Sequence, residues 1–136
     1  MAVIYLDACF LIYAVEGIGP RGDAARRALG GAASGQRFAI SPLVAMECLV
    51  KPFRQADLRL EDDYRAAFTD FEMLTIPPTV FERAARLRAS ARIKTPDALH
   101  WAIAHSAGCR RLWTGDAGLA AAAKGFAIDP FVDVSP

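Results

Sequence analysis

Four acidic side chains stand out because each lies beside sequence that is typical of a buried core. Asp7 follows the apolar run VIYL, and Asp116 follows the apolar stretch in LWTGD. Asp97 opens the segment DALHWAIA, and Glu47 is the only charged residue in PLVAMECLV. Glutamate is almost never fully buried unless it is paired or bound to something. These four carboxylates are therefore the candidate reactive groups of the chain.

The simplest interpretation of the three aspartates is structural. Asp7, Asp97 and Asp116 each stand near the predicted start of a helix. A carboxylate there accepts hydrogen bonds from backbone N–H groups and meets the positive end of the helix dipole, which is worth about 0.3–1 kcal/mol. Capping does not explain Glu47, which lies a full turn inside a helix that is apolar all round and therefore predicted to be buried. Taken singly, each aspartate fits capping as well as ligand binding.

Predicted strands alternate with predicted helices along the whole chain, and this alternation gives the acids a common location. It predicts an α/β fold, a three-layer α/β/α domain with a parallel sheet and right-handed crossovers. All four acids then fall beyond the carboxyl ends of the strands, where open α/β sheets bind ligands. The predicted strands are Val3 to Leu6, Arg37 to Ile40, Met73 to Ile76, Arg111 to Thr114, and an edge strand at Phe126 to Ile128 or at Phe131 to Val134.

The helices between these strands are predicted from apolar spacing and from capping residues. Ser41 is expected to cap one helix with Pro42 at its first position, and Thr95-Pro96 to start another in the same way. On the fourth helix Leu58, Tyr64 and Phe68 are expected to pack. The predicted helices are Cys9 to Val15, Arg21 to Ala33, Leu43 to Phe53, Asp57 to Phe71, Thr79 to Ala91, Thr95 to Ser106, and Ala117 to Lys124.

The composition is that of one globular domain, predicted to span residues 1–136. The chain is 54% apolar and 23% charged, and its net charge of +1 excludes a protein that coats nucleic acid with general positive charge. Cys9, Cys48 and Cys109 have no CxxC spacing and predict reduced core thiols. No stretch resembles a signal peptide or a membrane span, so we expect a soluble protein that does not engage a membrane and is cytoplasmic.

Four carboxylates at one edge would repel one another and raise their pKa values unless a cation resides there. Oxygen ligands without a histidine or thiolate cluster suit Mg²⁺ or Mn²⁺ better than zinc. Such an ion lowers the pKa of a bound water and neutralises charge on a leaving oxygen, which suits phosphodiester cleavage. The sequence shows no convincing triad with an activated Ser, Cys or Lys nucleophile.

With these residues placed, the sequence resembles the PIN-domain nucleases, and among them the VapC-type toxins of bacterial toxin-antitoxin pairs. The stretches that carry the resemblance are IYLDACFLIYAVEG, ISPLVAMECL, TPDALHWAIA and LWTGDAGL. The resemblance implies a five-stranded parallel sheet and an endoribonuclease that uses Mg²⁺ or Mn²⁺. It also implies an antitoxin partner and a homodimer. It assigns the metal to Asp7, Asp97 and Asp116, and assigns Glu47 to the positioning or deprotonation of water.

Two positions depart from the family pattern without removing a carboxylate. Cys9 stands where the family usually has Ser, Thr or Asn, a polar group that supports the water shell of the metal. A thiol is a weaker hydrogen-bond partner, which puts that supporting role of Cys9 in question. Gly115 stands where the family varies, and the adjacent Thr114 keeps the common hydroxyl as a second supporting residue. An active enzyme is therefore favoured over a decayed relative.

Basic and imidazole side chains near the acids are candidates for RNA contact. Arg92 and Lys94 immediately precede the helix that bears Asp97 and are predicted to steer RNA phosphate to the site. His100 lies one helical turn from Asp97 and could act as a proton shuttle or a phosphate contact, although a structural role is favoured. His105 is not at the i, i+4 spacing of a metal pair and is predicted to be structural.

Three other classes of protein are alternatives to the nuclease. One is a catalytically inactive PIN-like scaffold or RNA-binding module whose carboxylates only cap helices, which Mn²⁺ would not stabilise. A receiver-like phosphoacceptor would need an adjacent acidic pair after the first strand, whereas Ala8 follows Asp7. A haloacid-dehalogenase-like phosphatase would need an aspartate where Cys9 stands. The RNA target is not encoded in any pattern of the sequence.

Overall fold

The computed structural model describes residues 2–31 and 35–131. Over these residues the chain forms a five-stranded sheet with the order β3-β2-β1-β4-β5, and all neighbouring strands are parallel. The strands are β1 (Val3–Leu6), β2 (Arg37–Ile40), β3 (Glu72–Met73), β4 (Arg111–Trp113) and β5 (Ala127–Ile128).

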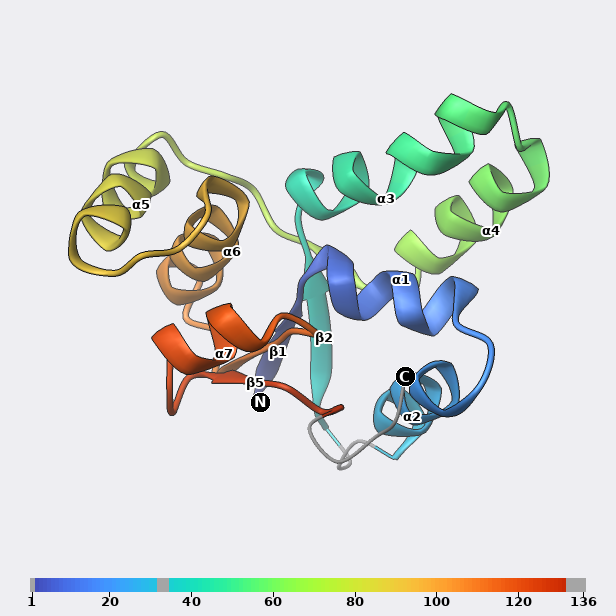
Figure 1. Ribbon diagram of the computed structural model, residues 1–136, viewed down its shortest axis with the longest axis horizontal. Coiled ribbons are helices and arrows are strands. Elements are labelled where there is room, and N and C mark those ends of the chain that lie inside the picture. Colours follow the sequence, from blue (N-terminus) through green and yellow to red (C-terminus); the bar gives the residue numbers. More distant parts are fainter. Residues whose placement is uncertain (1, 32–34, 132–136) are drawn as a thin grey trace.

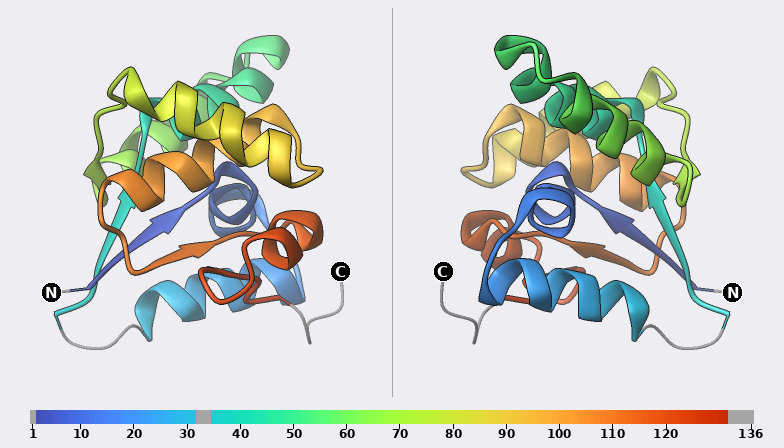
Figure 2. Two further views of the ribbon diagram at one scale, coloured as in Figure 1. Left: turned by 90° about the vertical axis from the view of Figure 1, so that its left-hand side faces the viewer. Right: turned by 90° about the vertical axis from the view of Figure 1, so that its right-hand side faces the viewer.

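Helices cover both faces of the sheet, which gives the predicted three-layer α/β/α fold. Figure 1 shows α1 to α4 on one side of the strands and α5 to α7 on the other. The two views of Figure 2 place α2 and α6 on opposite sides of the sheet. The helices of the described residues are α1 (Ala8–Glu16), α2 (Pro20–Gly30), α3 (Pro42–Gln55), α4 (Leu58–Phe68), α5 (Thr79–Ser90), α6 (Thr95–Ser106) and α7 (Ala117–Ala122).

The strand order places a topological switch point between β1 and β4. The chain leaves β1 through α1 and α2 toward β2, and it leaves β4 through α7 toward β5, on the opposite side of β1. The Asp7 N–H donates to the Trp113 carbonyl at 3.2 Å, so the two strands stay together up to their ends. Ligands of open α/β sheets bind in the crevice at such a switch point. Asp7 directly follows β1, and Asp116 lies in the short turn between β4 and α7.

The core lies on both faces of the central strand. Ile4, Tyr5 and Leu6 of β1 are at most 2% exposed, and Phe10 from α1 and Ile103 from α6 belong to the same buried cluster. Full burial of such a side chain is worth about 1.5–3 kcal/mol. A strand buried on both faces explains why VIYL is apolar without alternation. No helix in the described ranges is long and apolar enough to cross a membrane.

The third strand is shorter than predicted and begins one residue earlier. We expected Met73 to Ile76, but β3 pairs with β2 only at Glu72 and Met73. The Leu74 N–H still donates to the Ile40 carbonyl, at 2.8 Å, and then the chain leaves the sheet. An edge strand has a partner on one side only, so apolar composition alone does not extend it.

The edge strand on the other side confirms one of the two alternatives. β5 lies within Phe126 to Ile128, whereas Phe131 to Val134 runs beyond residue 131 and so lies outside the described residues. The helix predicted at Arg21 to Ala33 is observed as Pro20–Gly30, and its last two predicted residues also lie outside them.

The prediction that the helix around Glu47 is buried was wrong. One face of α3, formed by Val44, Cys48 and Pro52, is buried. The opposite face exposes large apolar side chains, with Met46 58% exposed and Phe53 57% exposed. Apolar composition all round a helix does not distinguish a buried helix from one with an apolar face free for a partner.

Two smaller helix predictions also needed correction. Leu58 was expected to pack but is exposed at the start of α4, where Asp57 accepts the capping bond from the Leu60 N–H at 3.0 Å. The helix that follows Ile93 is preceded by Lys94 as its N-cap, so Thr95 is already its first residue and does not cap it. Helix ends shift by one residue easily, because neighbouring polar residues compete for the same position.

Candidate active site

Thr114 connects the two aspartates at the switch point. Asp7 caps α1 by accepting from the Phe10 N–H at 2.8 Å, and Asp116 caps α7 by accepting from the Leu119 N–H at 3.0 Å. The Thr114 hydroxyl accepts from the Asp116 N–H at 2.9 Å and also hydrogen-bonds to the Asp7 carboxylate. Both aspartates therefore cap helices, which is one of the two interpretations that the sequence left open, and Thr114 lies beside both of them.

Asp7 is the most buried of the four acids. Only 2% of the residue is exposed, and burial raises the pKa of its carboxyl from 3.8 to about 6. Hydrogen bonds from Thr114 and from the Phe10 N–H act against this rise, while the negative charge of Asp97 adds to it. The fold therefore holds Asp7 in an environment with little water, where ionisation of its carboxyl costs free energy.

Asp97 lies in the first turn of α6 and is half-buried. Burial raises its pKa, and repulsion from Asp116 and, more weakly, from Glu47 raises it further. The charge of Lys94 acts in the opposite direction. Asp97 therefore lies near enough to Asp116 and Glu47, and Asp7 near enough to Asp97, for their charges to act on one another at this edge of the sheet.

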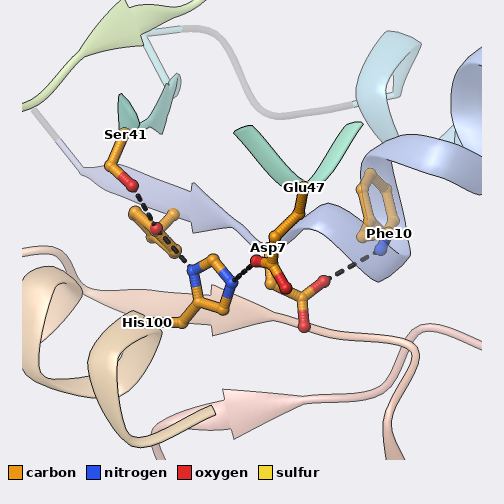
Figure 3. A network of polar contacts seen from close by, with 6 residues as sticks. Asp7, Phe10, Ser41, Glu47 and His100 are labelled. Atoms are coloured by element: carbon orange, nitrogen blue, oxygen red, sulfur yellow. Dashed lines mark hydrogen bonds and ion pairs between the residues drawn. The ribbon is translucent and has the colours of Figure 1, made fainter. Parts of the chain in front are cut away.

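Glu47 reaches this edge from the opposite helical layer. Its side chain is 29% exposed, and its Oε1 lies 2.5 Å from Nε2 of His100. His100 is only 2% exposed, so it is buried and cannot serve as the direct phosphate contact considered from the sequence. Figure 3 shows the His100 ring between the Glu47 carboxylate and the polar contacts that continue toward Ser41.

Tyr5 and Ser41 are members of the site that sequence reasoning missed. The Tyr5 hydroxyl lies 2.7 Å from Nδ1 of His100 and 2.8 Å from Oγ of Ser41. Ser41 precedes α3 as its N-cap, as expected, but its side chain makes no capping bond because its hydroxyl is used by Tyr5. The sequence signal that could have led to this network was His100, a polar residue in the apolar middle of α6, one turn from Asp97.

The prediction of a core thiol was wrong for Cys9, which is only partly buried and lies beside the acids, and the other two thiols lie in the core. Cys48 and Cys109 are buried, as predicted, and all three cysteines are free. Burial, followed by the charge of Asp7, raises the pKa of the Cys9 thiol to about 12. Cys9 is therefore a protonated thiol and a weak hydrogen-bond partner at neutral pH.

The two residues predicted to contact RNA are on the surface. Arg92 and Lys94 are both exposed, and Lys94 is close enough to lower the pKa of Asp97. His105, predicted to be structural, pairs with Arg83 and packs edge-on against Phe126.

The donor set at the edge consists of carboxylate oxygens, which suit a hard divalent cation such as Mg²⁺ or Mn²⁺. Among the described side chains, no three His, Cys, Asp or Glu residues are arranged closely enough to form a ready metal cage. Mg²⁺ usually keeps several waters and binds one or two carboxylates directly, so the residues present fit it without such a cage. Asp7 is buried and Asp97 is half-buried, and both have raised pKa values, so a cation would stabilise their charged forms most.

These features define a parallel α/β domain with a carboxylate-lined switch point, and the comparisons place it in a family. The chain belongs to the PIN domain family, whose model matches residues 4–125. The predicted relationship to PIN-domain proteins is thus confirmed. A search of the curated proteins finds no significant match.

Solved structures of toxin-antitoxin proteins share the fold. A toxin-antitoxin complex from Klebsiella pneumoniae is 26% identical with a TM-score of 0.75, covering 96% of this chain and 98% of that chain. VapC20 from Mycobacterium tuberculosis, a toxin that cleaves the sarcin-ricin loop, is 20% identical with a TM-score of 0.73, covering 98% and 99%. VapBC2 from Rickettsia felis, bound to promoter DNA, is 15% identical with a TM-score of 0.78, covering 93% and 97%.

Proposed function

We propose that this protein is an endoribonuclease toxin that depends on Mg²⁺ or Mn²⁺ and is neutralised by a cognate antitoxin. The observation that carries the proposal is the meeting of Asp7, Glu47, Asp97 and Asp116 at the switch point of a PIN fold. Repulsion within this group costs free energy that a bound divalent cation would offset.

In this proposal Asp7, Asp97 and Asp116 would hold the metal, and Thr114 would orient the Asp7 carboxylate while its bond to the Asp116 N–H holds the backbone of that residue. The bound ion would supply an acidified water and neutralise charge on the leaving oxygen. Glu47 lies across from the aspartates with one carboxylate oxygen on His100, so its second oxygen is available to orient a water or accept its proton. Arg92 and Lys94 would attract the RNA phosphates to this edge.

Two protein partners belong to the proposal. The similar solved structures include toxin-antitoxin complexes from Klebsiella pneumoniae and Rickettsia felis, which supports an antitoxin as partner. We also propose a homodimer. The exposed apolar side chains of α3 provide surface for protein partners, since large apolar patches on soluble proteins usually mark interaction sites.

The inactive module is the second candidate, and one observation favours it. Asp7 and Asp116 each cap a helix, which is the whole role that this alternative gives them. Capping does not account for Glu47, which lies in the middle of α3. It does not account for Asp97 either, because Asp97 is not the N-cap residue of α6 and accepts no capping bond. The nuclease is therefore the better explanation of the four acids together.

The test is cleavage of a total cellular RNA pool by the purified, antitoxin-free protein, with Mn²⁺ and with EDTA. Asp97→Asn is compared with Asp62→Asn, which changes an exposed acid on α4. Discrete fragments that require Mn²⁺, vanish in Asp97→Asn and persist in Asp62→Asn would support the nuclease and identify its target. No cleavage, together with a melting temperature that Mn²⁺ leaves unchanged, would support the inactive module.

A further inference from the structure

A chain of four polar side chains runs from the buried sheet to the acidic edge (Figure 3). It passes from Ser41 through Tyr5 and His100 to Glu47, with contacts of 2.8, 2.7 and 2.5 Å. Ser41 and Tyr5 are fully buried, and only Glu47 reaches solvent. This series of hydrogen-bonded side chains thus reaches solvent only at Glu47, the carboxylate that we have assigned to water activation.

The chemistry of the four groups fixes the direction of their hydrogen bonds when the imidazole is neutral. An ionised carboxylate only accepts, so Nε2 of His100 must carry the hydrogen that faces Glu47. Nδ1 is then an acceptor and takes its hydrogen from the Tyr5 hydroxyl. A tyrosine hydroxyl is protonated at neutral pH, so it can donate this hydrogen. The Tyr5 oxygen in turn accepts from Ser41.

The contact between His100 and Glu47 also joins two layers of the fold. Glu47 comes from α3 on one side of the sheet and His100 from α6 on the other, as Figure 1 shows for the two helices. The Glu47 side chain is exposed enough to hydrogen-bond to water. It therefore does not need His100 as a hydrogen-bond partner for its charge to be stabilised. One carboxylate oxygen is held by the bond to His100, which limits the orientations available to the other.

We propose that His100 is a positioning residue for the Glu47 carboxylate, and that Tyr5, itself bonded to Ser41, holds the imidazole ring from its other nitrogen, Nδ1. The inference rests on the proposed nuclease function. Because His100 is buried, it acts only through Glu47 and does not touch RNA. Changes at His100 should therefore affect kcat, while KM for RNA stays the same.

The tautomer is measured by ¹⁵N NMR of the imidazoles at pH 8, without RNA or metal. The chain has two histidines, so His105 serves as an internal reference. We expect one protonated nitrogen on His100, Nε2, and a mixture of tautomers in Glu47→Gln, because an amide can accept from or donate to Nε2. Glu16→Gln is the matched control, because it changes a second partly buried glutamate, one that accepts from Tyr64. Protonation at Nδ1, or a pattern that Glu47→Gln leaves unchanged, would overturn the inference.

A kinetic experiment compares two variants of His100 whose side-chain amides can replace different nitrogens of the ring. His100→Gln can place an N–H near the position of Nε2, whereas His100→Asn cannot reach it. We expect His100→Asn to lower kcat by about 10- to 100-fold, the usual effect of losing such a supporting partner. His100→Gln should recover most of the loss, and His105→Gln should match the wild type. Equal losses in both His100 variants, or a change confined to KM, would contradict the positioning role.

The two experiments separate this inference from the proposed function. If the wild-type protein cuts no RNA under any condition, the nuclease proposal fails, and the role of Glu47 fails with it. If it cuts RNA but His100 carries its hydrogen on Nδ1, the nuclease stands and only the positioning role falls.

Discussion

The Sγ atom of Cys9 lies only 2.6 Å from the point where a Cβ atom would be at residue 115. Cys9 belongs to the first turn of α1, and Gly115 lies between β4 and α7. The two positions that depart from the PIN pattern are thus in direct contact across the switch point. The larger Cys9 side chain is accommodated because residue 115 has no side chain.

This contact predicts that Gly115→Ala destabilises the protein and that Cys9→Ala rescues it. Overpacking of this kind costs about 1–3 kcal/mol, because the backbone around the new methyl group must move. In the double variant the space is free again, so the free energies of unfolding, measured in urea, should show a coupling of at least about 0.5 kcal/mol. Additive effects of the two substitutions would show that the contact does not limit packing there.

The burial of Asp7 predicts an unusual pH dependence of stability in the metal-free protein. Its pKa is about 6 in the folded state against an ordinary value of 3.8, so the folded protein binds this proton more tightly than the unfolded chain. The resulting stability is fully present below about pH 4 and is lost as the pH rises through 6. Asp7→Asn, which cannot ionise, should therefore be more stable than the wild type at pH 7, by about 1–3 kcal/mol.

The control for this prediction is Asp57→Asn. Asp57 also caps a helix through its carboxylate, but it is exposed at the start of α4. Asparagine is as good an N-cap as aspartate, so both variants keep that interaction. Thermal unfolding in EDTA from pH 4 to pH 8 should separate the Asp7→Asn curve from the wild-type curve only toward higher pH. A variant that is less stable than the wild type at pH 7 would contradict the cost assigned to the buried charge.

The exposed Lys94 predicts a salt-dependent contribution to RNA binding. Lys94→Ala should raise KM for RNA and leave kcat almost unchanged, because the proposed function gives Lys94 a phosphate to attract and no contact with the reacting atoms. Loss of one phosphate contact should reduce the slope of log KM against log salt by about 0.7 for single-stranded RNA. Arg86→Ala is the control, since Arg86 is exposed on α5 and faces Glu82. Equal slopes for Lys94→Ala and the wild type would remove Lys94 from the RNA path.

The fold was predictable because local signals and the apolar pattern agreed. The VIYL run, the aspartate caps and the alternation of strands with helices gave the layers, the parallel sheet and the edge that collects the acids. The length of β3 was not predictable from its residues. It depends on where the backbone of β3 stops pairing with β2, which the tertiary structure decides.

The interior of the site was less predictable than its acids. Glu47 and His100 are 53 residues apart and come from helices on opposite sides of the sheet, so no local spacing links them. Ser41 carries an ordinary capping signal, yet its hydroxyl turns to Tyr5 in the buried sheet. Such contacts are decided by tertiary packing, which a residue's own sequence neighbours do not encode.

The exposed apolar face of α3 predicts where a second copy of the chain binds. Met46 lines an apolar pocket together with Phe81 of α5, and these two side chains are 58% and 57% exposed. Burial of such a side chain in an interface is worth about 1.5–3 kcal/mol, which corresponds to at least about a tenfold change in Kd. Met46→Lys should therefore shift a dimer toward monomer in sedimentation experiments, without lowering the melting temperature of the monomer.

The matched control is Ile18→Lys, which changes an apolar side chain that is fully exposed in the turn between α1 and α2. It should leave the dimer intact, because a single exposed apolar residue is ordinary for a soluble protein. A monomeric wild-type protein at high concentration would contradict the homodimer itself. A dimer that survives Met46→Lys but dissociates in Ile18→Lys would move the interface away from α3, toward the α1 and α2 side of the molecule.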